Sequence, residues 1–201
     1  MTRKTTEYFG ILTKMFEAVK VNGYNRESFP LEEGMDRVKR VIQDLTAAGG
    51  KVMFIGNGAS AAIASHMATD FWKNAEIRAM AFNDASGLTC ISNDFGYSRV
   101  FEKPIERFAD PGDLLIAISS SGQSENILRA VAAARAREVK IITFSGFDPE
   151  NPLRKLGELN FYVPSFQYGI VEIVHLSLLH CLVDFMIKEQ AEAKEKITVY
   201  K

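Results

Sequence analysis

The chain is poor in cysteine and in the long apolar runs that span membranes. It holds two cysteines, Cys90 and Cys181, which lie far apart between apolar neighbours, so we expect both to be buried and reduced. No apolar run reaches the about 20 residues that a transmembrane helix needs. The first residues lack the apolar core of a signal peptide. We therefore expect a cytoplasmic protein without a membrane partner.

An excess of charge of either sign is also missing. The 201 residues carry 24 basic and 25 acidic side chains, spread along the chain, for a formal net charge of −1. Such a balance argues against a surface that attracts nucleic acid or an anionic membrane. The length suits a single domain over residues 1–201 that buries a sizeable core.

What the sequence does have is an alternation of short apolar segments and helical patterns. The segments that read as buried strands are 52–55, 79–82, 114–118, 141–144 and 161–163. This alternation predicts an α/β fold, a parallel sheet with helices on both faces, over residues 51–164. Helices are expected before it at 5–21 and 30–45, within residues 1–48, and a long apolar helix after it at 168–193. The first and last helices either pack on the sheet or form an interface between identical subunits.

The most informative segment is a serine loop between the strand 114–118 and a helical pattern that begins at Asn126. It contains Ser119, Ser120, Ser121, Gly122 and Ser124. Such a loop surrounds one point with backbone N–H groups, the positive end of a helix dipole and hydroxyl donors. One serine could simply cap the helix, but this loop holds more hydroxyls than a cap needs. The loop therefore predicts a phosphate site.

A second loop follows the strand 52–55 in the same way. Its glycines, Gly56 and Gly58, allow close backbone approach or a positive φ, and Ser60 can cap the next helix or meet a ligand hydroxyl. The loop lacks the third glycine of a dinucleotide-binding fingerprint. By itself it is weak evidence of a ligand site.

Ionisable side chains stand out on two predicted helices. His66 and Asp70 lie four residues apart, where a pair can bind a metal, divide acid and base work, or simply lie on the surface. Glu172 and His180 lie in the apolar last helix, where charges are costly and favour a site, although a solvated stripe would look the same. Their separation is about 12 Å of helix rise, so one metal could join them only from midway.

Together these motifs resemble those of sugar isomerase (SIS) domains, and within them the phosphoheptose isomerases. The matching segments are 56–62, Ser92-Asn93-Asp94-Phe95-Gly96 and 118–124, with His66 and His180 in corresponding places. The resemblance implies a homotetramer of subunits with a flavodoxin-like, five-stranded parallel sheet and an N-terminal helical pair. It also implies an aldose–ketose isomerase that converts sedoheptulose 7-phosphate into D-glycero-D-manno-heptose 7-phosphate through an enediol, for lipopolysaccharide or capsule.

The resemblance also implies roles for individual residues. The substrate-binding set it implies is Asn57, Gly58, Ser60, Asp94, Ser119, Ser120, Ser121, Ser124 and Glu172. The implied zinc set, with one ion per subunit, is His66, Asp70, Glu172 and His180. Asp70 is the expected general base and His180 the acid and base at the neighbouring carbon, with these roles exchanged if a metal weakens Asp70 as a base.

Several positions depart from the family pattern. Asp70 and Glu172 stand where the family has glutamate and glutamine, Gly169 stands where an acidic residue is common, and the segment 71–78 is short. The shorter Asp70 can displace a base by about 1 Å, which can cost about a hundredfold in rate. Two alternatives therefore stay open. One is a non-catalytic SIS protein that binds a sugar phosphate or a protein such as a replication initiator, and the other is an isomerase of a different sugar phosphate.

Overall fold

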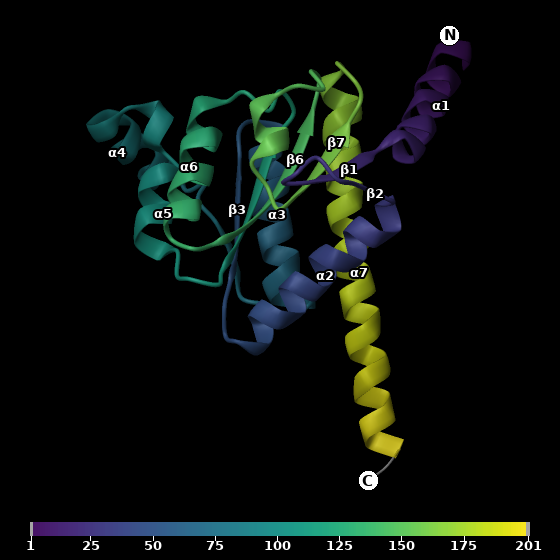
Figure 1. The fold of residues 1–201 in the computed structure, drawn as a ribbon. Coiled ribbons are helices and arrows are strands. Elements are labelled where there is room, and N and C mark those ends of the chain that lie inside the picture. The colour runs from purple at the N-terminus through teal and green to yellow at the C-terminus, as the bar shows by residue number, and fades with distance from the viewer. Residues whose placement is uncertain (1, 200–201) are drawn as a thin grey trace.

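A layered α/β fold confirms the class predicted from the alternating pattern (Figure 1). The computed structural model describes residues 2–199, with side chains described for residues 4–192. The helices are α1 (Thr2–Ala18), α2 (Leu31–Ala47), α3 (Ala59–Asn74), α4 (Ala85–Phe95), α5 (Glu102–Phe108), α6 (Glu125–Ala136) and α7 (Tyr168–Val199), with the 3₁₀ turns η1 (Tyr97–Arg99) and η2 (Pro152–Lys155). The strands are β1 (Lys20–Gly23), β2 (Ser28–Phe29), β3 (Val52–Gly56), β4 (Ala79–Ala81), β5 (Leu114–Ser119), β6 (Lys140–Gly146) and β7 (Leu159–Val163).

The sheet has seven strands in the order β2-β1-β7-β6-β5-β3-β4. The strands from β7 to β4 are parallel and are the ones that the sequence predicted. The expected count of five is corrected by the β1–β2 hairpin, which pairs antiparallel with β7 at one edge. The first helix was also predicted to extend too far, because α1 ends at Ala18 and Val21 lies in β1, opposite Phe161. The expected N-terminal helical pair is therefore α1 and α2 with a hairpin between them.

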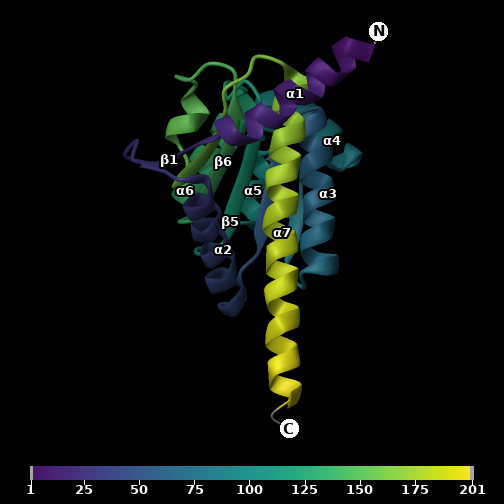
Figure 2. The same cartoon turned by 90° about the vertical axis from the view of Figure 1, so that its right-hand side faces the viewer.

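Helices cover both faces of the sheet (Figure 2). One core joins the sheet to α2, α3 and α7, and a second core joins the other face to α5 and α6. Along β5, Ile116 belongs to the first core, whereas Leu115 and Ala117 belong to the second, as the two-residue period of a strand requires. A strand that is buried on both faces needs the continuous apolar run seen in the sequence.

The last helix is longer than predicted, and its C-terminal part extends beyond the body of the protein (Figures 1 and 2). The segment Tyr168–Glu192 is long and apolar enough to cross a membrane by length and composition, contrary to our reading of the sequence. Half of its most apolar window is nevertheless buried inside the protein. Since α7 packs on α3, α2 and the sheet, its apolar character is that of a core helix in a soluble protein.

The strand order places the two predicted ligand loops side by side. Among the parallel strands, β3 comes first along the chain and lies between β4 and β5, so the order reverses there. Ligands of open α/β sheets bind at such a point, outside the carboxyl ends of the strands. The last residue of β3, Gly56, lies opposite Ile118 of β5. The glycine loop and the serine loop therefore begin next to each other.

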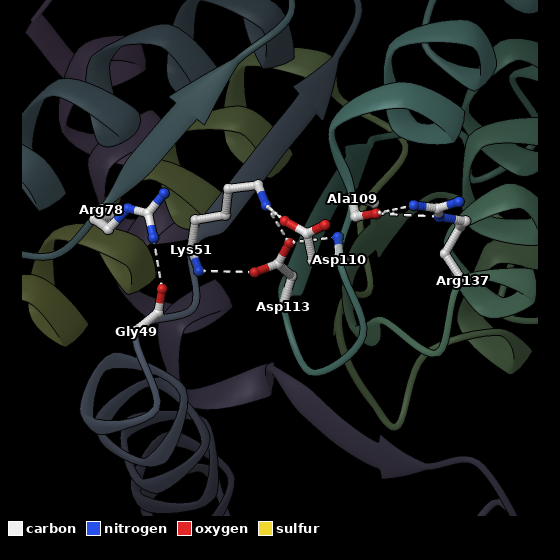
Figure 3. Close-up of polar contacts among 7 residues, drawn as sticks. All are labelled: Gly49, Lys51, Arg78, Ala109, Asp110, Asp113 and Arg137. Atoms are coloured by element: carbon white, nitrogen blue, oxygen red, sulfur yellow. Dashed lines mark hydrogen bonds and ion pairs between the residues drawn. The ribbon is translucent and has the colours of Figure 1, made fainter.

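At the amino ends of the strands, on the side of the sheet away from the ligand loops, a polar cluster joins the segments that enter β3 and β5 (Figure 3). The buried carboxylate of Asp113 accepts hydrogen bonds from the Lys51 backbone N (2.9 Å), Lys51 Nζ (2.6 Å) and the Asp110 backbone N (2.8 Å). Lys51 Nζ also donates to Asp110 Oδ2 at 2.6 Å, which is the main reason that the pKa of Asp110 lies below its usual range. The cluster lies far from the ligand loops, so we interpret it as structural.

Replacing Asp113 with asparagine should lower the free energy of unfolding by about 2 kcal/mol, because each hydrogen bond to a charged group contributes roughly 1.5–3 kcal/mol. Urea unfolding of the two proteins measures the difference. Asp184 is exposed on α7, so the Asp184→Asn control should unfold like the parent protein. Equal losses in the two variants would contradict a structural role for Asp113.

Candidate functional site

Two loops at the carboxyl ends of β3 and β5 form a pocket of about 250 Å³. Its lining residues are Asn57, Gly58, Ala59, Ser60, Ile118, Ser119, Ser120, Ser121, Ser124, Tyr168 and Glu172. The predicted substrate-binding residues all line this pocket, except Asp94. Tyr168 was not predicted, because it is placed there by the start of α7 rather than by either loop motif.

The glycine loop requires its glycines. A Cβ on Gly56 would lie 2.5 Å from the backbone of Ser60, so a side chain there would force α3 away from β3. Gly58 has a φ of 56° immediately before α3, in the left-handed region that glycine adopts without strain. The two glycines let the chain turn sharply and bring the buried Ser60 to the pocket.

The serine loop offers a ligand several hydroxyls, although Ser119 Oγ donates to Ser124 Oγ at 3.4 Å. Ser124 precedes α6, but its side chain makes no capping hydrogen bond, so the capping explanation of this serine does not hold. Ser119 Oγ accepts from the Gly122 backbone N at 3.2 Å, and Ser121 Oγ accepts from the Gln123 backbone N at 3.2 Å. Ser120 Oγ is buried and has no hydrogen-bond partner among the described residues. A buried hydroxyl without a partner, beside a helix N-terminus, is suited to an oxyanion.

The Ser120→Ala variant should separate ligand binding from stability. Removing a buried hydroxyl that lacks a partner should raise the free energy of unfolding by about 1 kcal/mol, since such a group is costly to bury. Removing one phosphate donor should weaken sugar phosphate binding about tenfold. Urea unfolding and calorimetric titration measure the two quantities. A loss of stability together with unchanged binding would show that Ser120 is an ordinary core residue.

A second group of polar residues fixes the glycine loop from behind. The side-chain amides of Asn57 and Asn126 exchange two hydrogen bonds of 2.9 Å, and Tyr97 Oη donates to Asn57 Oδ1 at 2.9 Å. Sequence reasoning missed Asn126 and Tyr97. The signal that the sequence offered was an asparagine directly after the serine loop, at the start of the helical pattern, and the structure shows that it is buried. Asn57 lines the pocket, and much of its amide serves to hold the two loops together.

Asp94 lies away from the pocket within this chain. It is exposed on α4, where its carboxylate accepts from Asn93 Nδ2 at 2.9 Å. Cys90 is exposed on the same helix, so the expectation that it is buried is wrong, and Cys181 is half-buried on α7. Because Asp94 does not line the pocket, the structure does not support its contact with a substrate bound in the same chain.

His66, Asp70 and His180 form a compact group, as the i,i+4 spacing suggested for the first two and the family resemblance implied for His180. His66 Nε2 lies 3.3 Å from His180 Nε2, and Asp70 Oδ2 lies 3.5 Å from His66 Nε2 and 3.7 Å from His180 Nδ1. Asn74 Nδ2 donates to Asp70 Oδ1 at 3.2 Å. The side chains of His66 and His180 are 52% and 37% exposed, so small molecules can reach the group. Such a group can bind a metal or transfer protons.

The donor set fits a zinc ion. One ligand atom from each of the three residues lies within 4.8 Å of the others. Tetrahedral zinc with Zn–N bonds of about 2.0–2.1 Å places its ligand atoms about 3.3–3.4 Å apart. The distances of His66 Nε2 from His180 Nε2 (3.3 Å) and from Asp70 Oδ2 (3.5 Å) are close to this value, whereas the 3.7 Å contact of Asp70 is with the other ring nitrogen, His180 Nδ1. Three protein ligands that leave the fourth position open are typical of catalytic zinc sites.

Glu172 is not part of this compact group within the described residues, although the resemblance implied it as a fourth ligand. It lines the serine-loop pocket and also a shallow apolar pocket of about 340 Å³ between α3 and α7. Two helical turns, about 12 Å of rise, separate it from His180, so both side chains could reach one ion only from midway between them. Burial raises the pKa of Glu172. Its position between phosphate loop and metal group suits contact with a substrate.

Known proteins match the chain over most of its length. Residues 25–146 match the SIS domain family. A phosphoheptose isomerase of Yersinia pestis (strain Pestoides F) is 36% identical over 167 residues, which cover 80% of this chain and 86% of the relative. Structures of phosphoheptose isomerases from Neisseria gonorrhoeae and Francisella tularensis match with TM-scores of 0.79 and 0.81, at 28% and 26% identity, over 92% and 94% of this chain and 97% and 98% of theirs. The chain therefore belongs to the SIS domain family and, within it, to the phosphoheptose isomerases.

Proposed function

We propose that this protein is an aldose–ketose isomerase that converts sedoheptulose 7-phosphate into D-glycero-D-manno-heptose 7-phosphate through an enediol. One observation carries the proposal: the chain has two sites that α3 and α7 share. One is the oxyanion pocket at the serine loop, and the other is the group of His66, Asp70 and His180. Glu172 of α7 lines the first site, and His180 of the same helix belongs to the second. A sugar phosphate held by its phosphate at one end can thus present its carbonyl end to acid and base groups.

The reaction needs one group that removes a carbon-bound proton and another that protonates oxygen or carbon in turn. In the proposed roles, Ser119, Ser120, Ser121 and Ser124 hold the phosphate, while Asn57, Gly58, Ser60 and Glu172 contact the sugar. Asp70 removes the proton next to the carbonyl. His180, which contacts both Asp70 and His66, acts as acid and base at the neighbouring carbon.

We propose zinc as the metal of this site, with one ion per subunit held by His66, Asp70 and His180. When bound, zinc would polarise the substrate carbonyl and make the adjacent carbon-bound proton more acidic. Asp70 offers a second carboxylate oxygen besides the one that faces the histidines, and Asn74 holds that oxygen by a hydrogen bond. Glu172 becomes the fourth ligand only if a shift of α7 or a bound substrate moves its carboxylate toward His66, Asp70 and His180.

A homotetramer is the assembly that we propose for the active protein. The pocket between α3 and α7 is lined by apolar side chains apart from His66 and Glu172, and the hydroxyls of a sugar find few partners there. On α4 no residue is fully buried, although Leu88 and Ile91 are apolar and Phe95 is 53% exposed. Surfaces of this kind favour contact with other subunits. In such an assembly Asp94 of one subunit would complete the site of another.

Sedoheptulose 7-phosphate and its isomer are charged metabolites, so we propose that the enzyme works in the cytoplasm. The product would supply heptose for lipopolysaccharide or capsule. Support for the first statement comes from the phosphate pocket, and support for the second from the similarity to phosphoheptose isomerases.

Incubation with sedoheptulose 7-phosphate in heavy water, with and without added zinc, tests the proposal. NMR and mass spectrometry should show the aldose, with deuterium at the carbon next to the carbonyl wherever the proton exchanges with solvent. Faster turnover with zinc, and its loss on chelation, would support the metal. Binding without any isomerisation or exchange would instead identify a sugar phosphate binding protein, and turnover of another sugar phosphate alone would correct the substrate.

A further inference from the structure

A second polar pocket lies at the edge of the sheet, between the β1–β2 hairpin and η2. It has a volume of about 200 Å³. Its charged and polar lining side chains are Asn22, Arg26, Glu150, Arg154 and Lys155. Three of these are cations and one is a carboxylate, so the lining carries a net charge of +2. Neither the sequence motifs nor the proposed reaction accounts for this excess of positive charge.

Arg154 is the fixed element of this pocket. Its Nε donates to Asn22 Oδ1 at 3.1 Å, its Nη2 donates to the same oxygen, and its Nη1 donates to the Pro149 carbonyl at 2.9 Å. The guanidinium carbon lies 4.2 Å from the centre of the Tyr162 ring. A planar guanidinium that is held in this way presents its remaining N–H groups in a set direction.

All of these partners of Arg154 are neutral. Within the described part of the chain, no carboxylate oxygen lies within ion-pair distance of its guanidinium. Arg154 is partly buried, and this burial lowers the pKa of its guanidinium. A partly buried charge without a counter-ion is unfavourable, and an anion that enters the pocket would relieve that cost.

The two other cations share one carboxylate. Lys155 Nζ lies 2.9 Å from Glu150 Oε2, and Arg26 Nη2 lies 3.6 Å from the same oxygen. Arg26, Glu150 and Lys155 are exposed enough to reorient, since their side chains are 70%, 65% and 40% exposed. A ligand with two negative charges would balance the net charge of the lining, with Lys155 and Arg26 closing on it from η2 and the hairpin.

This pocket is separate from the serine-loop pocket, because the two share no lining residue. The short turn η2 lies between them. On one side the Leu153 backbone N donates to the Gly122 carbonyl of the serine loop at 3.1 Å, and on the other side Arg154 and Lys155 line the second pocket. We propose that the pocket between the hairpin and η2 is a second oxyanion site, which binds the phosphoryl group of a small phosphorylated molecule.

Sulfate titration followed by NMR tests this site without reference to the proposed reaction. Sulfate should shift the Arg154 Nε–H signal in a saturable manner, and the Gly122 amide should report the serine loop separately. The double change Arg26→Gln and Lys155→Gln should weaken sulfate binding at Arg154 about tenfold or more, since charge-assisted hydrogen bonds are the strong ones. The Gly122 response should stay unchanged. Lys188→Gln, an exposed change on α7, is the matched control and should have no effect.

The Glu150→Gln variant gives the sharper result, because it removes the one carboxylate that competes with a bound anion. Sulfate should bind severalfold more tightly at Arg154 in this variant, whereas a purely structural ion-pair cluster predicts no gain. Glycerol 3-phosphate should shift the same signals as sulfate. The proposal is overturned if sulfate shifts Gly122 alone, if Glu150→Gln weakens binding, or if glycerol 3-phosphate fails to bind at Arg154 while sulfate does.

Discussion

The His180→Ala variant should lose about a thousandfold in kcat for sedoheptulose 7-phosphate, within the range of about 10²–10⁴ that a positioned acid–base group contributes. The imidazole lies next to both other members of the group, with Nε2 at 3.3 Å from His66 Nε2 and Nδ1 at 3.7 Å from Asp70 Oδ2, and it is exposed enough to reach a substrate. The KM should change far less, because His180 does not line the serine-loop pocket that holds the phosphate.

Ser177→Ala provides the matched control on the same helix. Ser177 Oγ donates to the Ile173 carbonyl of its own helix at 2.8 Å, so its removal should leave kcat unchanged. Steady-state kinetics and calorimetric binding of the substrate measure both variants, with zinc content determined on the same samples. A His180→Ala enzyme that turns over within about twofold of the parent would remove His180 from the mechanism. Loss of substrate binding would show that its main role is to hold the site together.

The fold could be predicted from the sequence for those strands and helices whose own residues determine their secondary structure. The parallel strands are short, continuous apolar runs. Such a run is typical of a strand that is buried on both faces of a sheet, and these strands contribute to both cores. The β1 strand could not be recognised in this way. Val19 continues the apolar spacing of the preceding helix. The strand β1 follows directly and exists because Val21 pairs with Phe161 of β7, far along the chain. Its identity is thus a tertiary effect.

The candidate site shows the same division. The serine loop and the glycine loop were recognisable because each motif is local, and the strand order then brings them together. Asn126 and Tyr97 have no motif of their own, and they matter only because both meet Asn57. For Glu172 the family resemblance suggested a metal ligand, whereas helix geometry separates it from His180. The about 12 Å of helix rise between Glu172 and His180, which lets one ion join them only from midway, could be calculated from the sequence.

His175 should make the protein lose stability in acid. Its ring is fully buried against Phe144, Nε2 contacts the Ser145 carbonyl at 3.1 Å, and Nδ1 has no partner among the described residues. Burial lowers the pKa of His175 to about 4, below the ordinary value of about 6.5. Between these two values the unfolded chain binds a proton that the folded protein excludes. The contribution is therefore intact above about pH 6.5 and is lost as the pH falls toward 4.

The expected loss is about 3 kcal/mol by pH 4, since the shift is about 2.5 pKa units at about 1.4 kcal/mol each. Urea unfolding at intervals from pH 7.5 to 4 measures it in the parent protein and in His175→Gln. Glutamine keeps a donor for the Ser145 carbonyl but cannot be protonated, so the variant should lose less stability than the parent over this interval. Carboxylates that titrate in the same range act equally in both proteins, and the difference between the two curves isolates His175. Parallel curves would contradict the prediction. They would mean that His175 is protonated in the folded state as readily as in the unfolded chain, for example because a water molecule or a shift of α7 gives Nδ1 a hydrogen-bond partner.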